Sequence, residues 1–198
     1  VGSEMCIRDR DNALEQAREL AIVALALAPE DPKVRALQLE VETAQRVLGF
    51  NRAGEDDLRN GRLGEDGNGA LVNFRDAAQL DPDNPRTRQG LAAVESALLR
   101  RAEQAAETAN FVAARYWLQM AGQVRERAPT IADARARIER MRRAQIAALR
   151  DAGLRDLTTP RGLKPAGEKL AEVLRIADPG DPVAGDLRRR LELATHYG

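Results

Sequence analysis

The chain has 198 residues with 31 basic and 31 acidic side chains, is 43% hydrophobic and only 3% aromatic, and has one cysteine, Cys6, and one histidine, His196. These counts exclude an intrachain disulfide framework and a Cys/His metal cluster. A Cys/His catalytic pair is excluded as well once Cys6 is set aside with the adapter-like segment described next. The apolar run over residues 21–28 is too short for a membrane span, which needs about 20 residues, and no transmembrane segment is expected. Abundant Ala, Leu, Arg and Glu without alternating β-branched runs predict an all-α fold.

The first ten residues, VGSEMCIRDR, resemble the translation of a transposase adapter used in sequencing libraries. Such segments are set aside in fold reasoning. We therefore expect residues 1–10 to lie outside the fold and residues 11–198 to form it, with native sequence missing before Asp11. Because a targeting segment could be lost, the sequence is compatible with the bacterial cytoplasm or cell envelope.

A proline-containing turn recurs four times, at residues 28–32, 81–85, 128–130 and 178–182. The leading prolines, Pro29, Pro82, Pro129 and Pro179, are 53, 47 and 50 residues apart, and a near-constant period of roughly 20–50 residues is typical of stacked repeat proteins. The pattern predicts about four units of paired antiparallel helices, truncated at both ends. The first helix is expected over residues 12–28 and the last over residues 183–194.

Helices before the prolines carry small and apolar residues in steps of four and three, which lie on one helical face. In the third unit this pattern is displaced, and we attribute the displacement to one extra helical turn before Pro129. The helices after the prolines are expected to end at Gly49, at residues 108–110 and at Gly153. The expected contact faces are Ala17, Ala21 and Ala24; Ala70, Phe74 and Ala77; Ala114, Leu118 and Ala121; and Gly167, Ala171 and Leu174.

Residues 68–85, NGALVNFRDAAQLDPDNP, resemble the second helix of a tetratricopeptide repeat, because Ala, Phe, Ala and Pro stand at that family's spacing. The resemblance implies stacked antiparallel helix pairs, a tetratricopeptide-like α-solenoid, whose concave face binds peptides or partner helices. The units here are near 50 residues long, whereas that repeat has about 34. Longer first helices or larger loops are therefore expected.

The third unit concentrates the aromatic residues. Trp117 is expected to be largely buried beside Phe111 and Leu118, because aromatic side chains mostly supply buried area. The alternative is that Trp117 and Tyr116 form a platform for a ligand.

These observations favour a non-catalytic protein-interaction scaffold that uses no cofactor or metal, and no catalytic residue can be assigned. A protein or peptide partner is expected, and self-association through exposed end helices is a further possibility. The candidate partner-binding residues are Trp117, Tyr116, Arg135 and Arg142.

Two alternatives remain open. Residues 11–85 carry a net charge of −7 and residues 86–198 carry +7, so the arginine-rich second half suggests nucleic-acid binding. Its arginines spread around the helix and few aromatics accompany them, so a nucleic-acid partner is not the favoured expectation. Residues 191–198 resemble the helical region preceding the catalytic domain of bacterial formylglycine-generating, sulfatase-modifying proteins, which implies a catalytic domain beyond Gly198.

Overall fold

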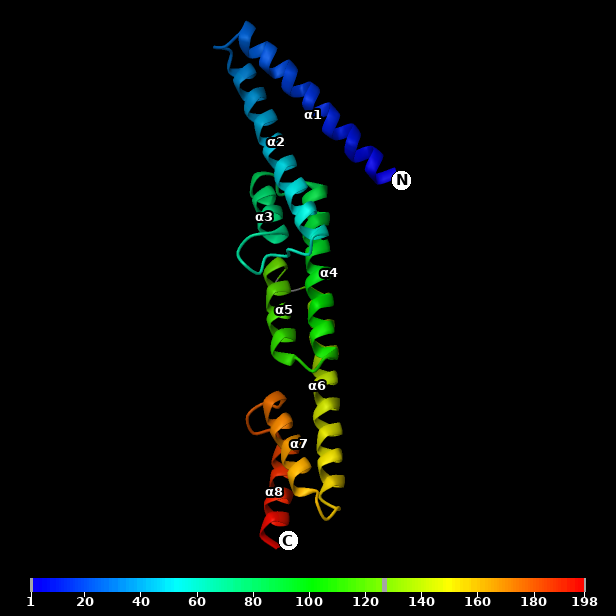
Figure 1. Cartoon of the computed structure of the whole chain (residues 1–198). Coiled ribbons are helices and arrows are strands. Elements are labelled where there is room, and N and C mark those ends of the chain that lie inside the picture. Colours follow the sequence, from blue (N-terminus) through cyan, green and yellow to red (C-terminus); the bar gives the residue numbers. More distant parts are fainter. Residues whose placement is uncertain (1, 126–127, 198) are drawn as a thin grey trace. The chain divides into compact units, whose positions relative to one another are not determined.

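The computed structural model describes residues 2–125 and 128–197. Within these ranges it consists of eight α-helices and contains no strand, which confirms the all-α prediction (Figure 1). The chain divides into unit 1, Val1–Glu95, and unit 2, Ser96–Gly198, with the division inside α4. The helices are α1 (Gly2–Leu27), α2 (Pro32–Arg59), α3 (Ala70–Leu80), α4 (Pro85–Glu107), α5 (Phe111–Val124), α6 (Pro129–Asp156), α7 (Leu163–Ile176) and α8 (Pro182–Tyr197).

Helices alternate between two kinds, which we call pre-proline helices (α1, α3, α5 and α7) and post-proline helices (α2, α4, α6 and α8). Every post-proline helix begins at a proline, whose fixed φ and missing N–H suit the first helical position. Three of the four are also capped by the preceding side chain: Asp31 accepts from the Lys33 N–H at 2.8 Å, Asn84 from the Thr87 N–H at 3.2 Å, and Asp181 from the Val183 N–H at 2.8 Å. Local sequence therefore fixes where these helices start.

The turns between paired helices correct the alignment of the third unit. Four residues separate α1 from α2, α3 from α4 and α5 from α6, whereas five separate α7 from α8. Pro129 is the first residue of α6, so it corresponds to Pro32, Pro85 and Pro182 and not to Pro29. The displaced pattern before Pro129 thus follows from matching the wrong proline, and the expected extra helical turn is wrong.

The predicted contact faces hold wherever the turn has four residues. Phe74 is 0% exposed, Leu118 is buried and Ala21 is buried, each with small neighbours on the same face. The face predicted for α7 is wrong: Ala171 and Leu174 are exposed, and the buried residues are Ala166, Val173 and Ile176. The α7–α8 turn has one residue more than the other three turns, and its Gly180 adopts φ +81°. The added residue displaces the buried face by one position.

Helix ends differ from the predictions at two glycines. Gly49 does not end α2, which continues to Arg59, and α6 continues past Gly153 to Asp156. Residues 108–110 do follow the end of α4, where Ala109 adopts φ 56°. The first helix ends at Leu27, one residue before the expected end, and its helical backbone begins at Gly2 and not at residue 12. That residues 1–10 contribute nothing to packing stays a prediction.

Unit 1 is centred on Phe74. Its ring lies between α2 and α4, at positions where both helices carry glycine: a Cβ placed on Gly54 would lie 2.9 Å from Phe74 Cζ, and one on Gly90 would lie 2.2 Å from Cε1. Two missing side chains therefore create the space that the ring fills.

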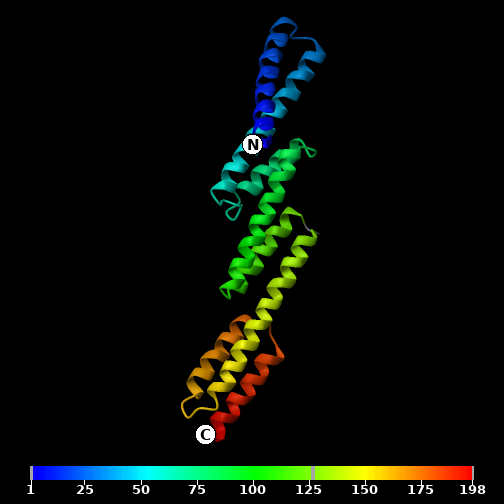
Figure 2. The same ribbon diagram turned by 90° about the vertical axis from the view of Figure 1, so that its right-hand side faces the viewer.

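Unit 2 has one continuous core to which its five helical segments all contribute, with α7 and α8 beside α6 (Figure 2). Its buried members include Ala102 and Ala106 from α4, Phe111 and Ala114 from α5, Ile138 and Ile146 from α6, Val173 from α7 and Leu187 from α8.

Candidate functional site

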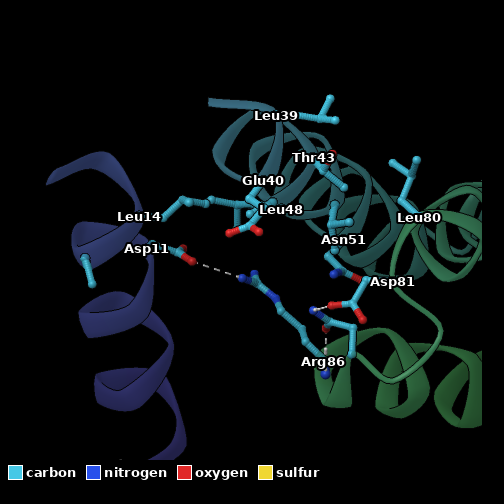
Figure 3. A pocket seen from close by; sticks show the side chains of 14 residues that line it. Asp11, Leu14, Leu39, Glu40, Thr43, Leu48, Asn51, Leu80, Asp81 and Arg86 are labelled. Carbon is cyan, nitrogen blue, oxygen red and sulfur yellow. Dashed lines mark hydrogen bonds and ion pairs between the residues drawn. The ribbon is translucent and has the colours of Figure 1, made fainter. Parts of the chain in front are cut away.

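A large open groove lies in unit 1 between α1, α2 and the α3–α4 turn (Figure 3). It has a volume of about 760 Å³. Its surface is mainly apolar, and the apolar side chains come from α1, α2 and α3. They are Leu14, Leu39, Val47, Leu48 and Leu80, with Ala13 and Ala44 between them.

Helix α2 forms the floor of the groove. Its lining residues recur at helical spacing, as in Glu40, Ala44, Val47 and Asn51, and therefore lie on one face of the helix. A buried polar contact holds the start of α4 against α2 beside the groove: the Thr87 hydroxyl of α4 donates to Asn51 Oδ1 of α2 at 3.0 Å. Both side chains are almost completely buried. A buried polar pair of this kind fixes where α4 begins relative to α2.

Arg86 closes one end of the groove with two ion pairs. Its guanidinium binds Glu55 through Nε at 2.6 Å and Nη2 at 2.7 Å, and it reaches Asp11 of α1 at 3.4 Å. The hydrogen bond to Glu55 raises the pKa of Arg86 most, and burial works in the opposite direction. Arg86 is therefore charged and already occupied, and it joins α1, α2 and α4.

The remaining charge at the groove is negative. Glu40 is exposed and forms no hydrogen bond or ion pair with the described residues. Asp81 accepts a hydrogen bond from the Asn84 amide at 3.0 Å but has no cationic partner among them. An occupant of the groove would thus meet leucine side chains together with carboxylates that have no cationic partner among the described residues.

A second cavity, of about 410 Å³, lies in unit 2 and brings together two of the predicted partner-binding residues, Arg135 and Arg142. Arg142 is buried and fully engaged. Its Nη2 lies 2.6 Å from Asp178 and 2.8 Å from Glu139, and its Nη1 donates to the Ile176 carbonyl at 3.1 Å. Arg142 therefore ties α6 to the α7–α8 turn and does not offer its charge to a partner.

The pKa shifts agree with that role. The hydrogen bond from Arg142 lowers the pKa of the Glu139 carboxyl most, and Arg143 adds to the effect. The pKa of Arg142 is raised, chiefly by Glu139. Arg135, by contrast, is exposed and has no ion pair with the described residues.

Trp117 and Tyr116 do not line this cavity. Their rings meet edge to face with centroids 5.0 Å apart, and the Arg101 guanidinium of α4 lies 4.8 Å from the centre of the Trp117 ring. Trp117 is only partly buried at the edge of the unit 2 core, and Tyr116 is exposed. The expectation of a largely buried Trp117 is therefore met only in part: the ring packs at the edge of the core, and the Arg101 guanidinium, not an apolar side chain, lies over its face.

Many arginines of α6 have partners within the chain. Arg137 pairs with Glu103 of α4, Arg143 with Glu139 at 2.9 Å, and Arg150 with Asp151 at 2.7 Å. Within residues 2–125 and 128–197 no group of three or more His, Cys, Asp or Glu could hold a metal ion. In the same ranges, no helix has the length and apolar character needed to cross a bilayer.

Sequence reasoning missed the groove because it followed only the main stripe of each helix. The apolar stripe that helical spacing gives α2 consists of Val34, Leu37, Val41, Ala44 and Leu48. Leu39 lies off this stripe and is 65% exposed, and a leucine among polar neighbours was the available signal. That Leu39 lines the same groove as Leu14 and Leu80 depends on how α1 and α3 pack on α2, which periodicity does not give.

No known protein-family model matches the chain, and comparisons with curated protein sequences and with solved structures gave no significant match.

Proposed function

We propose that this chain is a protein-binding module whose unit 1 groove holds the apolar face of an amphipathic helix from a partner protein. The single observation that carries the proposal is the open leucine-lined groove of about 760 Å³. Grooves of this kind bind a helix through side chains at i, i+3/i+4 and i+7. Exposed apolar surface bordered by polar residues commonly marks an interaction site.

Charge specifies the partner further. Residues 11–85 carry a net charge of −7, and Glu40 at the groove has no cation among the described residues. Arg86 cannot attract an acidic partner, because Glu55 and Asp11 already bind it. The preferred partner helix therefore has lysine or arginine beside its apolar stripe, since complementary charge sets partner choice and association rate.

This proposal agrees with a non-catalytic scaffold and with the tetratricopeptide resemblance. We also propose that the repeated helix pairs stack as a tetratricopeptide-like α-solenoid. The helical arm of a formylglycine-generating enzyme is compatible with the same groove and remains an alternative. Nucleic-acid binding has less support, because carboxylates of the chain already pair with Arg137, Arg142, Arg143 and Arg150.

The test uses a labelled helical peptide with leucines at i, i+4 and i+7 and lysines flanking them. Fluorescence anisotropy should show saturable binding to the full chain. The same peptide with glutamates in place of the lysines should bind at least about tenfold more weakly, because a like charge replaces an attractive one.

The variant Leu39→Asp places a charge in the groove and should weaken binding by roughly tenfold or more. The matched control is Leu37→Asp, on the same helix and exposed, but not part of the groove. Circular dichroism verifies that both variants keep their helicity. Equal binding of both peptides, or equal loss in both variants, would remove the groove as the site.

A further inference from the structure

Three pre-proline helices use the same position to contact the post-proline helix before them. Asn73, twelve residues before Pro85, donates to Asp57 of α2 at 2.8 Å. Trp117, twelve before Pro129, lies against Arg101 of α4. Lys169, thirteen before Pro182 because that turn is one residue longer, lies 2.6 Å from Asp156 of α6. This position is therefore a helix-contact position in α3, α5 and α7.

In α1 the corresponding residue, twelve before Pro32, is Leu20, which is 69% exposed. Val23 and Leu27 follow it at i+3 and i+7 and are also exposed, so the three form one apolar stripe. We call these three residues the α1 stripe. Glu19 lies beside it, at i−4 from Val23, and forms no ion pair with the described residues.

Helix α8 offers a complementary surface. Leu193 is 58% exposed, and Arg189 precedes it by four residues on the same face. Arg188 and Arg189 form no ion pair with the described residues, whereas Arg190 pairs with Asp186 at 3.3 Å. The α8 surface thus combines an exposed leucine with arginines that have no carboxylate partner among the described residues. The α1 stripe is apolar, and the neighbouring Glu19 has no cationic partner in the same part of the chain.

We propose that the α1 stripe binds α8 of a second copy of this chain, with Leu193 against Leu20 and Arg189 near Glu19. The opposite net charges of residues 11–85 and 86–198, −7 and +7, favour the same head-to-tail orientation. Such an interface is heterologous: each copy uses α1 toward one neighbour and α8 toward another. The contact is separate from the groove, since neither Leu20 nor Leu193 lines it.

The test is sedimentation velocity on the full chain over a concentration series. The unmodified chain should associate reversibly, and added salt should weaken the association because it screens the charges. Leu20→Glu and Leu193→Glu should each be monomeric when alone, with association weakened by about tenfold or more. Leu37→Glu, an exposed leucine of α2 outside the stripe, should associate like the unmodified chain.

Mixing the two monomeric variants distinguishes the orientation. Leu20→Glu keeps an intact α8 and Leu193→Glu keeps an intact α1 stripe, so an equimolar mixture should form a one-to-one dimer and nothing larger. Combining Glu19→Arg with Arg189→Glu in one chain should restore association that each change alone weakens.

Three results would overturn the proposal. A monomer at every concentration would assign the α1 stripe to a helix of another chain. Self-association of Leu193→Glu alone would indicate a symmetric contact between two α1 helices. A mixture that remains monomeric would show that α8 and the α1 stripe do not bind each other.

Discussion

Replacing Gly90 with alanine tests the packing around Phe74 most directly. An alanine Cβ at this position would lie 2.2 Å from Cε1, 2.4 Å from Cζ and 2.6 Å from Cδ1 of the Phe74 ring, whereas ordinary contacts begin near 3.4 Å. The ring is 0% exposed and Gly54 of α2 lies on its other side. The ring therefore cannot move away without displacing α2 or α3.

Two effects oppose each other in Gly90→Ala. Alanine stabilises a helix interior by about 1 kcal/mol relative to glycine. Overpacking a core costs typically 1–3 kcal/mol and occasionally more, and an overlap of more than 1 Å with an aromatic ring belongs at the upper end. We expect a net loss of about 2 kcal/mol, which lowers the melting temperature by roughly 4–8 °C for a chain of this size.

The matched control is Gly49→Ala in α2, where a Cβ would have nothing within 4 Å. It should stabilise the protein by about 0.5–1 kcal/mol. Thermal and urea unfolding followed by circular dichroism measure both variants. In a double-mutant cycle, Phe74→Leu should recover at least about 1 kcal/mol of the Gly90→Ala loss. If Gly90→Ala were as stabilising as Gly49→Ala, the account of the Phe74 core would be wrong.

Three further predictions concern caps and ion pairs. Asn84→Ala removes the acceptor for the Arg86 and Thr87 N–H groups and should cost about 1 kcal/mol in urea unfolding, whereas Asn84→Asp should cost little. Arg142→Ala should lower the free energy of unfolding by about 2–3 kcal/mol, because it deletes charged hydrogen bonds to Glu139, Asp178 and the Ile176 carbonyl. Arg142→Lys should recover only part of this loss. Equal stability of all three proteins would contradict the structural role of Arg142. The pKa of Glu139 is lower in the folded than in the unfolded chain. Its contribution to stability is therefore present above the unfolded pKa and is lost as the pH falls through the folded pKa. Glu139→Gln should reduce the acid dependence of the free energy of unfolding, and an unchanged dependence would refute the shift.

Much of the helical architecture could be predicted because it depends on local sequence. The Asx-Pro pairs at Asp31, Asn84 and Asp181 mark helix starts through a side-chain cap and a fixed proline φ. The Ala70, Phe74 and Ala77 face follows from helical spacing alone. Gly49 misled the prediction because an exposed glycine costs a helix only about 1 kcal/mol, which the packing of the rest of α2 exceeds.

The candidate sites were harder to predict because they depend on contacts between distant segments. Arg142 looked like a free cation on an arginine-rich helix, yet Asp178, 36 residues later, binds it. The apolar face of the groove needs Leu14, Leu39 and Leu80 together, from three helices. The periodicity of a single helix predicts only that such residues are exposed. They come together in one groove because α1 and α3 pack on α2.

The five-residue α7–α8 turn shows that a helix pair of this type tolerates a change in length. One more residue than in the other three turns left the Asp181 cap of α8 intact, and α7 still buries a continuous face, displaced by one position. The cap and the buried face are specified separately on the two sides of the turn. Insertions and deletions in natural relatives should therefore gather at these turns, and a single added residue there should be a permissive site for attaching a label or a foreign loop.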